Sequence, residues 1–122
     1  DFDGIIFGIK DTYPVEIKEK TAAFDKSRLG EYFGLDIGPF VKLAFFANKT
    51  SNMKSLFIVR EINNVKDREL KQWWAITFEQ ITRVASFVAI GGGTNMSGGG
   101  STVVRIPKSE FAKLNKEFMD NL

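Results

Sequence analysis

Hydrophobic residues recur along the first part of the chain in short runs that are typical of strands. Residues 5–9 are rich in isoleucine and end at a polar segment, residues 11–14, that predicts a turn. Residues 15–18 alternate apolar and charged side chains, which is the pattern of a half-buried strand. Three more apolar runs predict strands at residues 40–46, 56–59 and 70–76. The polar residues 48–54 and 63–69 are expected to connect these strands, the first of them as a hairpin loop.

The hydrophobic period changes after residue 76. Thr77 and Gln80 have the spacing of a capping box, in which the side chains at both positions bond the free amides of the first helical turn. Apolar residues then follow at the helical spacing, and Gly91 stands where a helix can end in the left-handed conformation. The pattern predicts a helix over residues 78–90.

Residues 91–101 contain six glycines and predict a flexible loop that cannot contribute to a core. A short strand is expected at residues 102–106. Pro107 suits the start of a helix, and Phe111, Leu114 and Phe118 are spaced to share one helical face. A second helix is therefore predicted over residues 108–121.

Strands in a run with helices set apart indicate the α+β class. We expect a single domain, residues 1–122, in which the helices 78–90 and 108–121 pack on one face of a curved antiparallel sheet. Residues 21–38, interrupted by glycines, give no clear assignment.

Composition narrows the possible functions. The chain of 122 residues has no histidine and no cysteine, which argues against most hydrolytic, redox and metal enzymes. Paired acids such as Asp1 with Asp3, or Glu16 with Glu19, are candidates for acid–base chemistry, but the sequence places neither pair in a pocket. We therefore expect a protein that is not an enzyme and needs no metal or cofactor, with carboxylate catalysis as the weakest alternative.

The charge distribution favours a polyanionic partner. Residues 1–36 carry five basic and eight acidic residues, a net −3, whereas residues 37–122 carry twelve basic and seven acidic residues, a net +5. Lysine and arginine also alternate with aromatic residues in the predicted strands. Trp73 and Trp74 are adjacent in one strand and must point to opposite faces, so one of them is available to stack on a base or to fill a subunit interface.

Several short stretches resemble the Whirly family of single-stranded DNA-binding proteins. Residues 18–24 are similar to that family's Lys-Gly-Lys-Ala-Ala-Leu segment, and residues 35–40 to its Leu-Asp-Ser-Gly-Ala-Phe segment. Residues 71–81 and 106–111 resemble its third strand with the first helix and the start of its last helix. The chain departs from the family at Glu19, where the family has glycine, and has fewer strands in its second half. The resemblance implies binding of single strands on a sheet surface, often by an oligomer, and allows an organellar location.

The sequence therefore predicts a domain that binds single-stranded DNA or RNA. The expected phosphate contacts are Lys18, Lys20, Lys42, Arg60 and Lys71. The expected stacking residues are Phe57, Trp73 and Trp74. The alternative is a structural protein that self-associates through exposed aromatic residues. We expect an intracellular homo-oligomer that does not enter membranes, since no apolar run approaches 18 residues, and a chain that is a fragment or processed product, since it begins at Asp1 without methionine.

Overall fold

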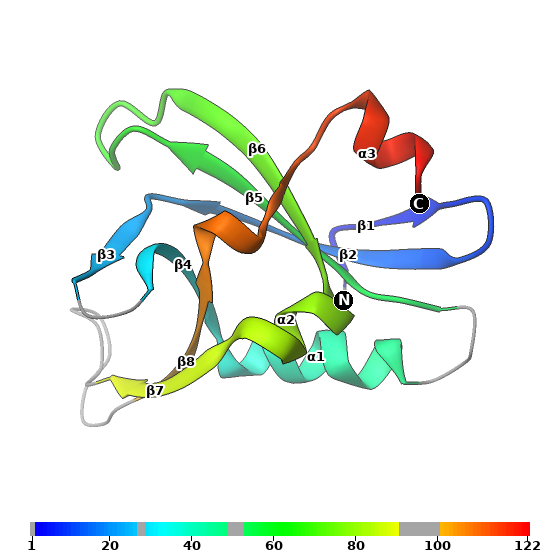
Figure 1. Ribbon diagram of the computed structural model, residues 1–122, viewed down its shortest axis with the longest axis horizontal. Coiled ribbons are helices and arrows are strands. Elements are labelled where there is room, and N and C mark those ends of the chain that lie inside the picture. Colours follow the sequence, from blue (N-terminus) through cyan, green and yellow to red (C-terminus); the bar gives the residue numbers. More distant parts are fainter. Residues whose placement is uncertain (1, 27–28, 49–52, 91–100) are drawn as a thin grey trace.

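The computed structural model describes residues 2–26, 29–48, 53–90 and 101–122, and for residues 86–90 and 101 it describes the backbone only. The chain is an α+β protein with two open sheets (Figure 1). The five-stranded sheet has the order β1 (Gly4–Phe7), β2 (Thr12–Lys20), β5 (Leu56–Ile62), β6 (Leu70–Thr77) and β9 (Ala112–Lys113). The four-stranded sheet has the order β3 (Ala23–Asp25), β4 (Gly30–Asp36), β8 (Ser101–Pro107) and β7 (Ser86–Ile90).

The helices lie on both sides of the five-stranded sheet. Helices α1 (Ile37–Ala47) and α2 (Phe78–Val84) run together below it, whereas α3 (Lys116–Asp120) lies above its opposite face, near β1 and the C-terminus (Figure 1). The pair β2–β5 is parallel, and the chain between the two strands includes β3, β4 and α1. Within the described part of the chain, no helix is long and apolar enough to cross a membrane.

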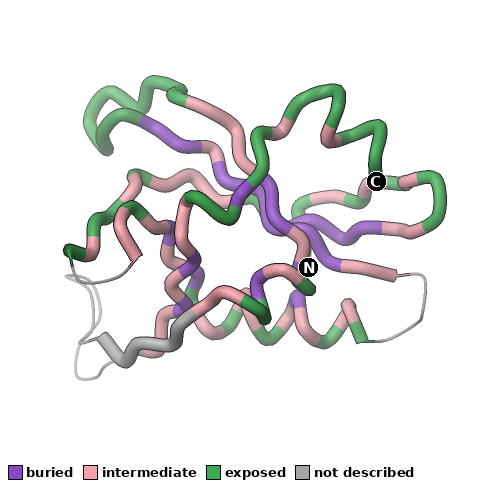
Figure 2. Tube along the Cα trace, viewed as in Figure 1, coloured by how far each residue is buried: buried purple, intermediate pink, exposed green. Residues whose placement is uncertain are grey.

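Two hydrophobic clusters cover the two faces of the five-stranded sheet. The first joins the sheet to α1, α2 and the four-stranded sheet, and it includes Phe33, Leu43, Phe57, Ile81 and Val104. The second lies on the other face and includes Tyr13, Val15, Leu56, Ile58, Ala75 and Leu122. Figure 2 shows buried residues along much of β2 and β5 and over part of β6, with exposed residues along the outer loops and most of α3.

Most of the predicted strands are confirmed. Strands β1, β2, β5, β6 and β8 fall on the apolar runs from which they were predicted. The start of α2 is also confirmed, because the Thr77 hydroxyl accepts a hydrogen bond from the Gln80 amide at 3.2 Å. The expected turn at residues 11–14 is too long, since β2 already begins at Thr12.

The predicted strand at residues 40–46 is wrong, because these residues belong to α1. Their apolar run is too dense to show a period, and such runs are ambiguous between strand and helix. In the structure Ile37, Phe40, Leu43 and Ala44 face the first cluster at helical spacing. Pro39 lies in the first turn, where its missing amide donor costs no hydrogen bond. Residues 48–54 therefore follow a helix and are not a hairpin loop.

The predicted helix at residues 78–90 is too long. It ends at Val84, Ala85 is extended, and β7 follows it and pairs antiparallel with β8. Residues 86–90 form backbone hydrogen bonds with β8 in place of the hydrogen bonds of a longer helix. The glycine-rich segment predicted at 91–101 cannot be assessed, since residues 91–100 lie outside the described residues.

The predicted helix at residues 108–121 is also wrong over most of its length. The segment is a 3-10 turn, η1 (Lys108–Glu110), then β9 beside β6, and only then α3. Phe111 is buried in the first cluster, whereas Leu114 and Phe118 pack half-buried against the second. A straight helix cannot reach clusters on opposite faces of one sheet, so the chain crosses the sheet edge in extended form. The C-terminal helix therefore does not share a face with α2. The expected antiparallel sheet is also wrong, because β2 and β5 pair in parallel and the five-stranded sheet is mixed.

Candidate functional site: a carboxylate–lysine cluster on the five-stranded sheet

Two acidic residues lie near the start of the five-stranded sheet, Asp3 just before β1 and Glu16 in β2. Asp3 precedes β1, and its amide donates to the carbonyl of Val15 at 3.1 Å. Its Oδ2 accepts a hydrogen bond from the amide of Ile17 at 2.7 Å. These bonds anchor Asp3 to the β2 backbone on either side of Glu16.

Glu16 is 4% exposed, which is rare for a carboxylate. Its Oε1 is 2.8 Å from the Nζ of Lys42 in α1, and its Oε2 is 3.6 Å from the Nζ of Lys18. The Oε1 atom is buried and makes no hydrogen bond, so its contact with Lys42 is an ion pair only. The Lys42 ammonium also lies 5.3 Å from the centre of the Phe2 ring, a cation–π distance.

The cluster of Asp3, Glu16, Lys18 and Lys42, called here the edge cluster, combines two kinds of chemistry. Its carboxylate oxygens are the ligands that hard divalent cations prefer. Its ammonium groups can bind phosphate oxygens. Lys18 is 41% exposed and Asp3 is exposed, so the cluster is open to solvent at one side while Glu16 forms its buried base.

Basic residues continue from the edge cluster along β2. Glu16, Lys18 and Lys20 alternate with residues of the opposite face, so they share one face of the sheet at steps of roughly 7 Å. Lys20 is paired in register with Glu61 of β5. Burial lowers the pKa of the Lys20 ammonium below its usual value; nearby Asp36 opposes this change and Lys18 adds to it.

Glu61 is the centre of a second charged group on the same face. It is 1% exposed, and its carboxylate accepts hydrogen bonds from Trp74 Nε1 and Lys108 Nζ, both at 2.9 Å. Lys71 lies 3.7 Å away. Burial alone would raise the pKa of Glu61, but the hydrogen bonds and the positive charges of Lys108 and Lys71 outweigh it, so the pKa lies below its ordinary value.

The predicted stacking residues are not exposed as expected. Phe57 is fully buried in the first cluster and cannot stack on a base. Trp73 and Trp74 do point to opposite faces, but each packs half-buried against one of the two clusters. The sheet is therefore covered on both sides. Of these three side chains, only Trp74 contacts the charged residues around Glu61.

The predicted phosphate contacts divide into two sets. Lys18, Lys20 and Lys71 lie on or beside the face that carries Glu16 and Glu61, and Lys42 joins them from a helix rather than from a strand. Arg60 is on the opposite face, where its guanidinium pairs with Glu19 at 2.7 Å. Glu19 also forms an ion pair with Arg68, so Arg60 belongs to an ion-pair network that is separate from the edge cluster.

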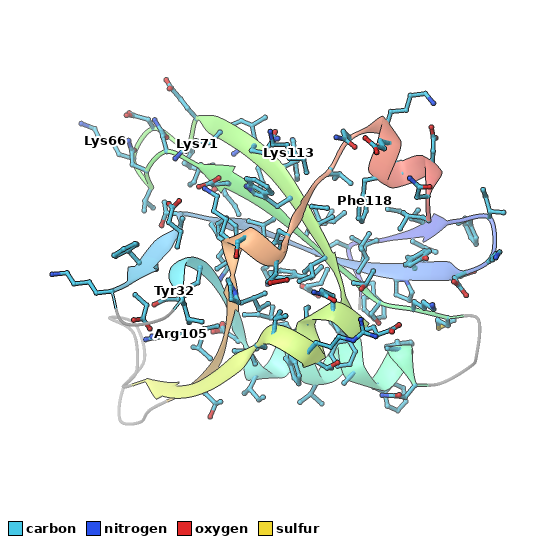
Figure 3. The ribbon with its side chains drawn as sticks, viewed as in Figure 1. Tyr32, Lys66, Lys71, Arg105, Lys113 and Phe118 are labelled. Atoms are coloured by element: carbon cyan, nitrogen blue, oxygen red, sulfur yellow. The ribbon has the colours of Figure 1, made fainter. Side chains whose placement is uncertain are left out.

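Several residues of the site were not identified from the sequence. Asp3 and Glu16 were considered only with their nearest acidic neighbours, and Asp1 lies outside the described residues. The alternation of residues 15–18 places Glu16 on the charged side of its strand, and the structure shows that this side is covered at Glu16. Figure 3 shows Lys66 and Lys113 near Lys71 at the upper rim of the five-stranded sheet. Arg105 lies beside Tyr32 on the four-stranded sheet, 4.8 Å from its ring.

Comparison with protein-family models, with curated proteins and with solved structures found no match for this chain. The resemblance to the Whirly family therefore stays a prediction, and the function must be argued from the geometry of the chain itself.

Proposed function

We propose that this chain binds a single nucleic-acid strand on the face of the five-stranded sheet that carries the edge cluster. The observation that carries the proposal is a run of basic residues on this face, namely Lys18 and Lys20 on β2, and Lys71 and Lys108 beside Glu61. Three of them, Lys18, Lys20 and Lys71, are phosphate contacts that the sequence predicts.

A nucleic-acid partner is supported by the extent of the positive charge. Lys20, Lys71 and Lys108 continue it from Lys18 along the same face, which suits a chain of phosphates rather than a single one. This retains the predicted partner, single-stranded DNA or RNA.

The test is a fluorescence-anisotropy titration of labelled single-stranded DNA, single-stranded RNA and duplex DNA at two salt concentrations. We expect tighter binding of the single strands than of the duplex, and a steep loss of affinity as salt rises, because neutralised phosphates release counterions. Lys18→Met and Lys71→Met should each reduce the slope of the salt dependence by about one unit. Lys116→Met, at an exposed lysine on α3, is the matched control and should bind as the wild type does.

Two other outcomes are informative. Binding that does not weaken as salt rises would contradict the proposed phosphate contacts. The absence of binding to every strand at low salt would favour the self-association alternative. A specific feature supports that alternative: Ile5, Phe7 and Ile9 are exposed at or just beyond β1, a free sheet edge, and Phe7 is 80% exposed. Sedimentation would then show a mass above the 13.7 kDa of one chain.

A further inference from the structure

A hollow of about 550 Å³ lies where the start of β4 faces β6 and η1. Its volume is within the range of sites for small organic molecules, roughly 300–1,000 Å³. Lys108 belongs both to this hollow and to the basic face, so a strand bound along that face would pass beside the hollow. The side chains that line it include Leu29, Glu31, Trp74, Lys108, Ser109 and Phe111.

The aromatic side chains of the hollow are fixed in place. The indole of Trp74 donates its hydrogen bond to the buried Glu61 at 2.9 Å, and Phe111 is buried in the first cluster. Aromatic side chains are the usual contacts of unpaired bases, because every base has a flat π-face. The hollow therefore suits a planar ring system such as a nucleobase.

A carboxylate and an ammonium group stand together at the same hollow. Glu31 alternates with the buried Phe33 on the inner side of β4, and its side chain is 53% exposed. Its Oε1 lies 3.6 Å from Lys108 Nζ, which is longer than a hydrogen bond. The Lys108 ammonium has three donors and gives one of them to Glu61 at 2.9 Å, so it can donate to a further acceptor in the hollow.

We propose that this hollow binds one guanine base of the strand, with Lys108 donating to guanine O6 and Glu31 accepting from the N1–H and the 2-amino group. This inference rests on the proposed function. The Watson–Crick edge of guanine presents one acceptor followed by two donors, and such edges are available in single strands. A lysine beside a carboxylate presents the complementary order of one donor and two acceptors.

The other bases fit this pair of side chains less well. Adenine and cytosine each have one amino donor next to a ring-nitrogen acceptor, and thymine and uracil have one N–H between two carbonyl oxygens. Each of them would leave one oxygen of the Glu31 carboxylate facing an acceptor or without a partner, which lowers affinity.

The experiment is a fluorescence-anisotropy titration with thymidine oligonucleotides that carry guanine, adenine, cytosine or hypoxanthine at one central position. The wild type should bind the guanine probe about tenfold more tightly than the unsubstituted oligonucleotide, in the range usual for a bidentate contact with a base edge. Hypoxanthine lacks the 2-amino group and should give an intermediate affinity. A probe with 7-deazaguanine, which keeps the Watson–Crick edge, should bind as the guanine probe does.

Glu31→Gln is the deciding variant, because it replaces one acceptor oxygen by a donor at an exposed position. It should abolish the preference for guanine and still bind the thymidine oligonucleotide, which also shows that the variant is folded. The readout is the ratio of the two affinities, since the loss of a negative charge changes the binding of all strands alike. Glu117→Gln, at an exposed acid on α3, is the matched control and should keep the preference.

The outcomes separate this inference from the proposed function. Binding of the thymidine oligonucleotide without a preference for guanine, or a preference that persists in Glu31→Gln, would overturn the guanine site and leave strand binding standing. No binding of any probe at low salt would overturn the proposed function together with this inference.

Discussion

Replacing Lys108 with methionine tests how the buried carboxylate of Glu61 is stabilised. Glu61 is 1% exposed, and Lys108 donates a hydrogen bond to its Oε2 at 2.9 Å. The substitution leaves the hydrogen bond from Trp74 and the more distant ammonium of Lys71, 3.7 Å away. A buried negative charge would then be only partly compensated.

The size of the effect follows from burial. Removing one partner of a fully buried ion pair costs about 3–5 kcal/mol of unfolding free energy. The Lys108 side chain is 18% exposed and Lys71 remains near, so we expect a smaller loss of about 2–3 kcal/mol at pH 7.

The loss should depend on pH. The pKa of Glu61 is lowered in the folded protein, so its contribution to stability is complete above the unfolded pKa of about 4.3 and is lost as the pH falls through the lower folded pKa. Without Lys108, the effect of burial on the pKa is opposed less and Glu61 takes up a proton at higher pH than in the wild type. A protonated Glu61 needs no cation, so the difference between variant and wild type should narrow as the pH falls toward 4.

Urea denaturation followed by circular dichroism at pH 7 and pH 4 measures both quantities. Lys116→Met is the control, because Lys116 forms an exposed pair with Asp120 on α3 and its loss should cost less than about 0.5 kcal/mol. An unchanged midpoint for Lys108→Met at pH 7, or a loss of equal size at both pH values, would refute the role assigned to this ion pair.

Two further predictions concern the C-terminal segment. Phe118→Ala should cost about 1–2 kcal/mol of unfolding free energy rather than the 3–5 kcal/mol of a fully buried phenylalanine, because its ring is half-buried on the second cluster; a loss above 4 kcal/mol in urea denaturation would contradict this placement. Gly8→Ala should cost about 1–3 kcal/mol, because an added methyl group would stand 2.7 Å from the Leu122 backbone carbon. Hydrogen exchange at the Ile9 amide, which donates to the Leu122 carbonyl, should accelerate in Gly8→Ala, and unchanged exchange would show that the C-terminus adapts.

Local patterns in the sequence were enough to locate the elements whose signal lies within a few residues. The alternation along residues 15–18, the apolar runs of β5 and β6, and the Thr77 cap each depend on near neighbours, and the structure confirms them. The α+β class followed from their order. The absence of histidine and cysteine also limited the available chemistry to carboxylates, lysines and hydroxyls.

Tertiary structure decided the features that depend on which surfaces are covered. Residues 40–46 are helical, and one face of that helix packs in the first cluster. Residues 108–121 form a turn, a strand and a short helix, because their apolar side chains pack on opposite faces of one sheet. The edge cluster belongs to the same class of features. Asp3 and Glu16 are thirteen positions apart and Lys42 is a further twenty-six, so only the pairing of β1 with β2 and the packing of α1 against β2 bring them together. The charged side of β2 faces the interior of the protein because both faces of its sheet are covered, and no pattern within β2 itself carries that information.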